Sequence, residues 1–210
     1  MCLDIQEKMN AVDAAEALIV SGDWLAARRV LETGLLSNPN DHWMRTRLGV
    51  TYYETGDYAE ALEHAERALA IAPKCPIVQW DLAGALQQLG KHSRAVEIYE
   101  VLVKRQVGWL AKDPCLQSRA LAKGLIADSQ LRLCRSLEAL ERKEEASAAF
   151  LEHLTMRGPG CYSLYSLDKF PKRGVVLRLW RQKKQKGQRA PAAMSNQALL
   201  TTRAVSEELQ

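Results

Sequence analysis

A period of 34 residues constrains the fold of this chain more than any other feature. The stretches SGDWLAA (21–27), TGDYAEA (55–61) and LGKHSRA (89–95) align at that spacing, each with glycine second and alanine last. A fixed period of this length is typical of stacked supersecondary units, each of which buries its apolar face against its neighbours. The period therefore predicts a solenoid with at least three equivalent units.

The spacing within a unit predicts two helices joined by a tight turn. In the second copy, apolar residues recur at steps of three and four on both sides of Gly56, which places them on one helical face. Gly56 suits a chain reversal that needs a positive φ. The small residues Gly49, Ala61 and Ala68 allow two helices to cross closely, and Pro73 ends the second helix.

This pattern resembles the tetratricopeptide repeat (TPR) family over roughly residues 8–107. In the second copy the matching residues are Leu48, Gly49, Tyr52, Gly56, Tyr58, Ala61, Ala68 and Pro73. In the first copy they are Ala15, Gly22, Ala27, Gly34 and Pro39, and in the third Leu82, Ala83, Gly90, Ala95 and Tyr99. The family's early Trp is replaced by Ala11, Arg45 and Gln79, and the third copy has Val107 in place of the closing Pro. The resemblance implies an all-α superhelix in which the first helix of each pair lines the inner surface.

A degenerate fourth unit follows. Residues 127–154 repeat the apolar positions of the earlier copies, with Glu141 in place of the turn glycine. The step from Ala95 to Ala146 is 51 residues, so about half a unit is inserted. We expect this insertion to lengthen the second helix of unit three, to form a loop near 108–114, and to start a long helix at about residue 115. The predicted fold is a solenoid of three 34-residue repeats plus a degenerate fourth helix pair.

The predicted domain organisation has three parts. Residues 1–157 form the TPR superhelical domain, residues 158–189 form a capping segment with a basic helix, and residues 190–210 form a flexible tail. Terminal units of such arrays are often atypical because they cover the open end of the core.

Composition and the N-terminus favour a cytoplasmic protein. Hydrophobic residues make up 47% and charged residues 26%, which are ordinary values for a soluble domain. The first twenty residues have no basic flank before an apolar core, so they do not match a signal peptide. No apolar run is long enough for a transmembrane helix. The five cysteines are odd in number and widely spaced, and we expect reduced thiols.

The inner surface that the resemblance implies has an apolar and aromatic lining. Positions two, five, nine and twelve of each unit share one face of its first helix. The candidate groove residues are Met9, Val12, Glu16, Trp43, Thr46, Val50, Tyr53, Ile77, Trp80 and Gln87. Such a lining fits an extended or helical segment held by hydrophobic anchors.

Some of the aromatic residues have a second interpretation as core. Trp43 and Trp80 fit either the groove or the core, because buried Trp is common. Trp24 occupies the position of Tyr58 in the next unit, and we expect it in the core.

A clamp for a peptide's C-terminal carboxylate, which some family members use, is disfavoured in this chain. Glu16 and Asp81 occupy two of the clamp positions and would repel a carboxylate. Only Arg47 has a useful charge there.

A basic segment follows the repeats. Residues 169–189 contain nine Lys or Arg and no acidic residue, while the net charge of the whole chain is +4. The candidate basic residues are Lys172, Arg173, Arg178, Arg181, Lys183, Lys184 and Lys186. Three interpretations remain open: a solubilising cap, a segment that binds nucleic-acid phosphates, and a segment that binds an anionic membrane surface.

The sequence contains no recognisable catalytic constellation. Its four histidines lie apart, and CxxC, HExxH, GxSxG and phosphate-binding glycine loops are all missing. We therefore expect a chain without enzymatic activity, cofactor or metal. The leading hypothesis is a protein–protein interaction module, an adaptor or chaperone-like protein that binds a peptide or helical segment in its concave groove. The alternative is binding of nucleic acid or an anionic membrane surface through residues 169–189. Whether the chain self-associates stays open.

Overall fold

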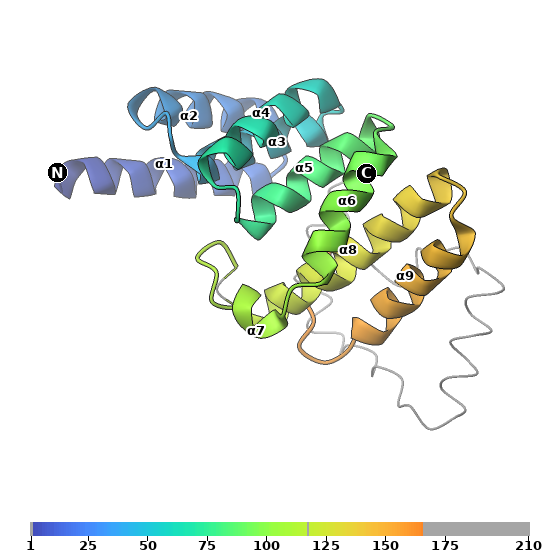
Figure 1. Ribbon diagram of the computed structural model, residues 1–210. Helices are drawn as coiled ribbons and strands as arrows, with labels where there is room; N and C mark the ends of the chain where they lie inside the picture. Colours follow the sequence, from blue (N-terminus) through green and yellow to red (C-terminus); the bar gives the residue numbers. More distant parts are fainter. Residues whose placement is uncertain (1, 117, 166–210) are drawn as a thin grey trace. The chain divides into compact units, whose positions relative to one another are not determined.

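In the computed structural model, residues 2–116 and 118–165 are described, and side chains are described from residue 11 onward. This part of the chain consists of helices, turns and short loops and contains no strand, so the all-α expectation is confirmed (Figure 1). The helices are α1 (Cys2–Val20), α2 (Trp24–Ser37), α3 (His42–Glu54), α4 (Tyr58–Ile71), α5 (Pro76–Gln88), α6 (His92–Val103), α7 (Val107–Leu110), α8 (Arg119–Ala139) and α9 (Lys143–Met156). Among them, none is both long and apolar enough to cross a membrane.

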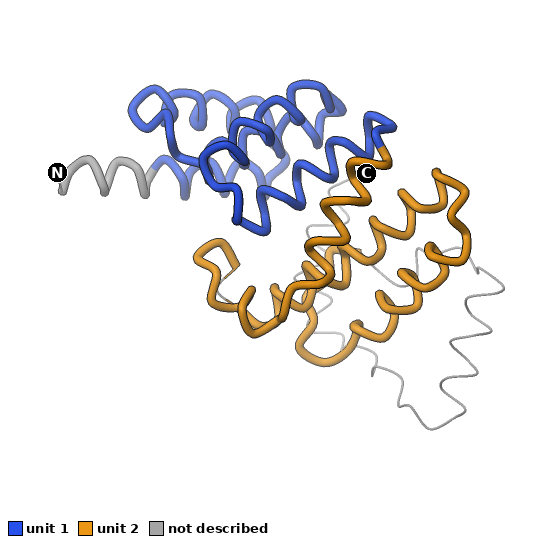
Figure 2. Tube along the Cα trace, viewed as in Figure 1, with its two compact units in different colours: residues 1–91, 204–210 blue, residues 92–203 orange. Residues whose placement is uncertain are grey.

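The chain divides into two compact units (Figure 2). Among the described residues, unit 1 ends at Lys91 and contains α1 to α5, whereas unit 2 begins at His92 and contains α6 to α9. The boundary therefore falls inside the third repeat, at the turn that follows α5.

In unit 1, helices adjacent in sequence pack against one another, and α3 also packs against α5. One core cluster consists of Ala15, Leu31, Met44 and Leu48. A side chain at Gly34 would place its Cβ 2.9 Å from Sδ of Met44, so the Met44 side chain packs directly against this small residue of the repeat pattern.

Trp24 is only half-buried, so its expected place in the core is wrong. Tyr58 and His92, at the same repeat position, are also half-buried. The first residue of the second helix therefore lies at the edge of the core in each repeat.

The turns inside the helix pairs share one geometry. The φ angle is +76° at Gly22, +83° at Gly56, +72° at Gly90 and +59° at Glu141. In every case the next residue donates its amide hydrogen to the carbonyl five residues earlier; Asp57 to Tyr52 and Arg142 to Leu137 both measure 2.9 Å. Glu141 therefore adopts the left-handed conformation that glycine adopts in the other turns, which confirms the register of the fourth pair.

The half-unit insertion differs from the expectation. Helix α6 has 12 residues and α2 and α4 have 14 each, so the expected lengthening of the second helix of unit three is wrong. The insertion instead forms the short helix α7, a loop and the 21-residue α8. Helix α8 starts later than expected, because Ser118 caps it by accepting a hydrogen bond from the Ala120 amide at 3.2 Å.

In unit 2, α8 packs against α6, α7 and α9. The fourth helix pair, α8 and α9, buries small residues at the predicted contacts, including Cys134 and Ala146. After α9 the chain turns through Gly158–Gly160 and returns along α8, where the Tyr162 amide donates to the Ala120 carbonyl at 3.1 Å. Of the predicted capping segment 158–189 only residues 158–165 are described, and the predicted tail lies wholly outside the described residues.

Candidate peptide-binding surface

The first helices of the repeats in unit 1 are α1, α3 and α5, and their starts are fixed locally. Asp41 precedes α3 and accepts a hydrogen bond from the Met44 amide at 3.0 Å. Pro76 is the first residue of α5, where its missing N–H costs nothing and its fixed φ suits a helix. These residues fix where α3 and α5 begin.

Arg47 is the central charged group on this face. Its guanidinium donates to Glu16 on α1, with 2.6 Å between Nη2 and Oε2, and lies 4.8 Å from the ring centroid of Trp43. Burial lowers the pKa of Arg47, but the hydrogen bond that Arg47 donates to Glu16 and the charges of Glu16 and Asp81 outweigh it, so the pKa is raised overall. Arg47 thus stays protonated and links α1 to α3, with the carboxylate of Asp81 on α5 nearby.

Three aromatic side chains among the predicted groove residues, Trp43, Tyr53 and Trp80, are each half-buried. The Tyr53 hydroxyl accepts a hydrogen bond from Nε2 of Gln88 at 3.0 Å, and its ring meets Tyr58 edge-on at 5.3 Å between centroids. Half-buried aromatic rings are held by the fold on one side and can contact a ligand on the other, which is how interface anchors are built.

The remaining predicted groove residues differ in accessibility. Thr46 is 2% exposed and its hydroxyl donates to the His42 carbonyl at 2.6 Å, so it offers no polar group to a ligand. Val12 is half-buried and packs against the core cluster around Leu48. Val50, Ile77 and Gln87 are half-buried, and Met9 lies in α1 where side chains are not described. The seven predicted basic residues, between 172 and 186, lie outside the described residues.

A network on the other side of α3 orients this helix, and the repeat pattern gave no signal for it. Arg28 on α2 donates to the Thr51 carbonyl at 2.8 Å and lies 3.9 Å from the ring centroid of Tyr52. Tyr52 in turn stacks on His64 with 5.3 Å between ring centroids. Burial lowers the pKa of His64, so this ring stacks in its neutral form at neutral pH.

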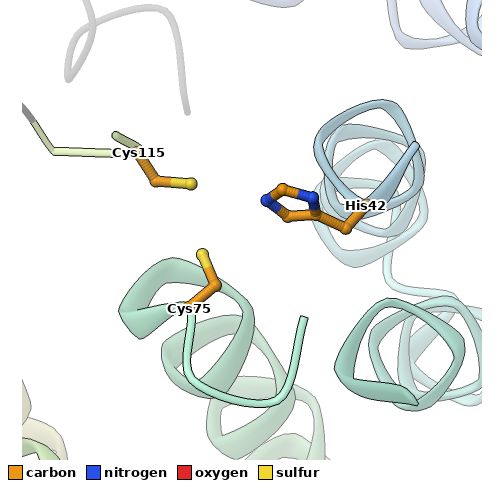
Figure 3. A group of neighbouring side chains, drawn as sticks. All are labelled: His42, Cys75 and Cys115. Atoms are coloured by element: carbon orange, nitrogen blue, oxygen red, sulfur yellow. The ribbon is translucent and has the colours of Figure 1, made fainter. Parts of the chain in front are cut away.

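His42 and Cys75 form a separate pair in unit 1. A ring nitrogen of His42, the first residue of α3, lies within 4.8 Å of Sγ of Cys75, which precedes α5, and the side chains point toward each other (Figure 3). Cys115, also drawn there, lies in unit 2, and its position relative to the pair is not determined. Two ligands are half of the four that a structural zinc ion takes, so the pair alone does not define a metal site. No fixed-spacing motif predicts it, because the two residues come from different repeats.

Comparison with known families agrees with this architecture. Models of the tetratricopeptide repeat match residues 12–76 and residues 52–111, so residues 12–111 of this chain are tetratricopeptide repeats. Proteins of this family are protein–protein interaction modules, which is the class that the half-buried aromatic surface of unit 1 also fits. The comparison with curated proteins gave no match.

Solved structures with a similar fold include several of the protein MamA. "MamA 41-end from Desulfovibrio magneticus RS-1" has a TM-score of 0.57 and 15% identity, covering 71% of this chain and 75% of its own. "Crystal structure of MamA" has a TM-score of 0.55 and 15% identity, covering 92% of this chain and 93% of its own. "MamA AMB-1 C2221" has a TM-score of 0.54 and 21% identity over the full length of both chains. At these identities the likeness concerns the fold alone.

Proposed function

We propose that unit 1 binds an apolar segment of another protein, extended or helical, on the face formed by α1, α3 and α5, and that the chain acts as a non-catalytic adaptor or chaperone-like protein. The observation that supports this most directly is the set of half-buried aromatic residues on α3 and α5, Trp43, Tyr53 and Trp80, of which Trp43 lies beside the guanidinium of Arg47. A solenoid needs apolar residues between its helices, and aromatic rings on an inner helix face serve a partner instead.

The charge of unit 1 indicates what should flank the apolar anchors of the ligand. Residues 1–91 contain eight Lys or Arg against thirteen Asp or Glu. The guanidinium of Arg47 is already engaged by Glu16, so it is a poor receptor for an acidic ligand. We therefore propose a ligand with large apolar side chains and basic neighbours, whose association the acidic surface would favour.

The test begins with peptides selected from a displayed random library against the full chain. Their dissociation constants would be measured by fluorescence anisotropy for the wild type, for Trp80→Glu and for Leu36→Glu. Leu36 is the matched control, because it is 85% exposed and lies on α2, the second helix of its repeat. We expect Trp80→Glu to weaken binding at least about tenfold and Leu36→Glu to leave it within about twofold.

Thermal unfolding by circular dichroism separates lost binding from lost structure. If Trp80→Glu unfolds the chain, Trp80→Leu keeps an apolar side chain at the position and removes only the aromatic contact. Equal binding by the wild type, the Trp80 variants and the control would show that the ligand sits elsewhere.

A further inference from the structure

The segment after α9 lies directly on one face of α8. The Tyr162 amide donates to the Ala120 carbonyl at 3.1 Å, and the Leu164 amide donates to Oδ2 of Asp128 at 2.8 Å. Between these contacts, a side chain at Gly124 would place its Cβ 1.4 Å from the Tyr162 carbonyl oxygen. Residues 120, 124 and 128 are one helical turn apart, so the main chain of this segment follows a single stripe of α8. Gly124 allows this approach because it has no side chain.

Two side chains of this segment are held by specific partners. The Ser163 hydroxyl donates to Oδ1 of Asp128 and accepts from Nη1 of Arg157 at 2.5 Å. Arg157 also donates to the Tyr165 carbonyl. Asp128, at 2% exposure, thus accepts both a main-chain amide and a serine hydroxyl.

Tyr165 is held by two arginines of α8. Its hydroxyl accepts from Nε of Arg132 at 2.6 Å. The guanidinium carbons of Arg132 and Arg135 lie 5.9 Å and 5.1 Å from the centroid of its ring. These contacts select an aromatic residue with a hydroxyl, since both ring face and oxygen are engaged. Leu164, between the two selected residues, is 63% exposed, so its identity is not selected.

The stripe on α8 is the inner face of the fourth repeat. In the shared register, Asp128 and Arg135 correspond to Trp43 and Val50 of the second repeat. The segment 161–165 therefore occupies, in the fourth repeat, the positions that we propose bind a ligand in unit 1.

We propose that this face of α8 is a binding site for a segment with the pattern Ser-x-Tyr, which the chain's own residues 163–165 occupy, and that a partner protein bearing this pattern competes for it. This proposal depends on the proposed function in one respect: both place the ligand on the inner face of the first helix of a repeat. A competitor without the serine hydroxyl would leave an oxygen of the buried Asp128 unsatisfied, and this penalty gives the site its selectivity.

The test uses the full chain and a fluorescein-labelled peptide of residues 158–168, with Ser in place of Cys161. In the double variant Ser163→Ala/Tyr165→Ala, the chain's own segment loses its selected contacts while the α8 residues stay intact. We expect this variant to bind the peptide at least about tenfold more tightly than the wild type, whose tethered segment competes. Adding Asp128→Asn should weaken binding again by about tenfold or more.

A matched control blocks the site without removing a polar contact. Gly124→Ala, added to the double variant, puts a Cβ where the peptide main chain must lie, while alanine suits the interior of α8. Peptide binding should be lost although helix content is kept. Peptide carrying Ala at both selected positions should bind none of the variants.

The proposal is overturned if the wild type and the double variant bind the peptide equally, or if neither binds while both keep their helix content. Equal affinity for the peptide in the double variant with and without Gly124→Ala would also overturn the proposal. If the double variant loses helix content, Tyr165→Phe alone, which removes one hydroxyl, should still raise peptide affinity several-fold, and no change would overturn the proposal. Trp80→Glu should leave this peptide unaffected, so failure of this site and failure of the unit 1 surface are distinguishable.

Discussion

The two units differ in the polar side chains that they bury. In unit 1 the fully buried polar residues among those described are Thr46 and Thr51, and each donates its hydroxyl to a carbonyl of its own helix. In unit 2 the helix pair α8–α9 buries Asp128, Ser129, Arg132, Ser136 and His153. Where the sequence follows the repeat pattern, the buried interior between the helices is apolar apart from these two threonines, and the polar contacts between helices, such as Glu16–Arg47, are only partly buried. Where it departs from the pattern, buried polar groups need particular partners, which makes the packing more specific and more costly to disturb.

The largest effects should come from deleting matched core leucines. Leu48 in unit 1 and Leu131 in unit 2 are both 2% exposed. Replacing either by Ala should lower the free energy of unfolding by about 2–5 kcal/mol, through lost burial and the cavity left behind. Urea unfolding followed by circular dichroism should show each substitution shifting a different transition. A single transition shifted equally by both would mean that the units unfold together.

The next effect concerns pH and arises in unit 2. Burial raises the pKa of Asp128 from 3.8 to about 6, and burial lowers the pKa of His153, whose Nδ1 lies 2.6 Å from the Ala127 carbonyl, from 6.5 to about 4. Between about pH 4 and 6, native Asp128 binds its proton more tightly than unfolded Asp128, so its contribution to stability falls as pH rises. Over nearly the same range unfolded His153 binds its proton more tightly, so that contribution rises with pH. In the wild type the two should largely cancel.

Single substitutions should reveal each half of this balance. In His153→Gln, the free energy of unfolding should fall by up to about 3 kcal/mol from pH 4 to pH 6, because only the Asp128 dependence remains. In Asp128→Asn it should rise by a similar amount as pH increases. Denaturant titrations at a series of pH values would measure both. If the free energy of unfolding of His153→Gln depended on pH as little as that of the wild type, the opposing contributions of Asp128 and His153 would be refuted.

The turns offer a smaller and reciprocal comparison. Gly56 and Glu141 occupy the same left-handed position in units 1 and 2. Gly56→Ala should destabilise the chain by about 1 kcal/mol, and Glu141→Gly should stabilise it by a similar amount, because only glycine adopts this conformation without strain. Thermal melts of both variants would check the signs, and a destabilised Glu141→Gly would mean that the glutamate side chain has another role.

The smallest effect should lie at the helix starts. The Asp23 carboxylate caps α2 by accepting from the Ala26 amide at 3.1 Å, whereas Arg142 occupies the equivalent position before α9 and makes no such bond. Asp23→Ala should cost about 1 kcal/mol. Arg142→Ala removes only an exposed pair with Glu145 and should change the unfolding midpoint by less than the measurement error. Equal losses of stability in Asp23→Ala and Arg142→Ala would contradict this difference between the helix starts of the two units.

The sequence was sufficient for the features that recur. The period predicted the helix pairs, the turn positions and even the register of Glu141, because each follows from packing that every copy repeats. Features that occur once could not be predicted in this way. The short helix α7 fills a half-unit with no equivalent elsewhere, and the contact of Ser163 with Asp128 joins residues that no shared position relates.

For the candidate site, repeat register predicted which residues of α3 and α5 share the inner face. It could not predict that the Thr46 hydroxyl is hydrogen-bonded within its own helix, or that Glu16 and Arg47 form an ion pair with each other. Those outcomes depend on rotamers and on distances between helices, which a period does not encode.

The shared turn also bears on how such a chain changes over evolutionary time. All four turns close through the same hydrogen bond across five residues, whether the left-handed residue is glycine or glutamate. A whole 34-residue copy can therefore be duplicated or deleted while every remaining turn keeps its geometry, since each repeat contacts mainly its neighbours. A fragment of a copy cannot be accommodated so simply. The half-unit between α6 and α8 is the place between the first and last helix pairs that departs from the 34-residue period, and it forms a short helix and a loop with no equivalent in the other repeats.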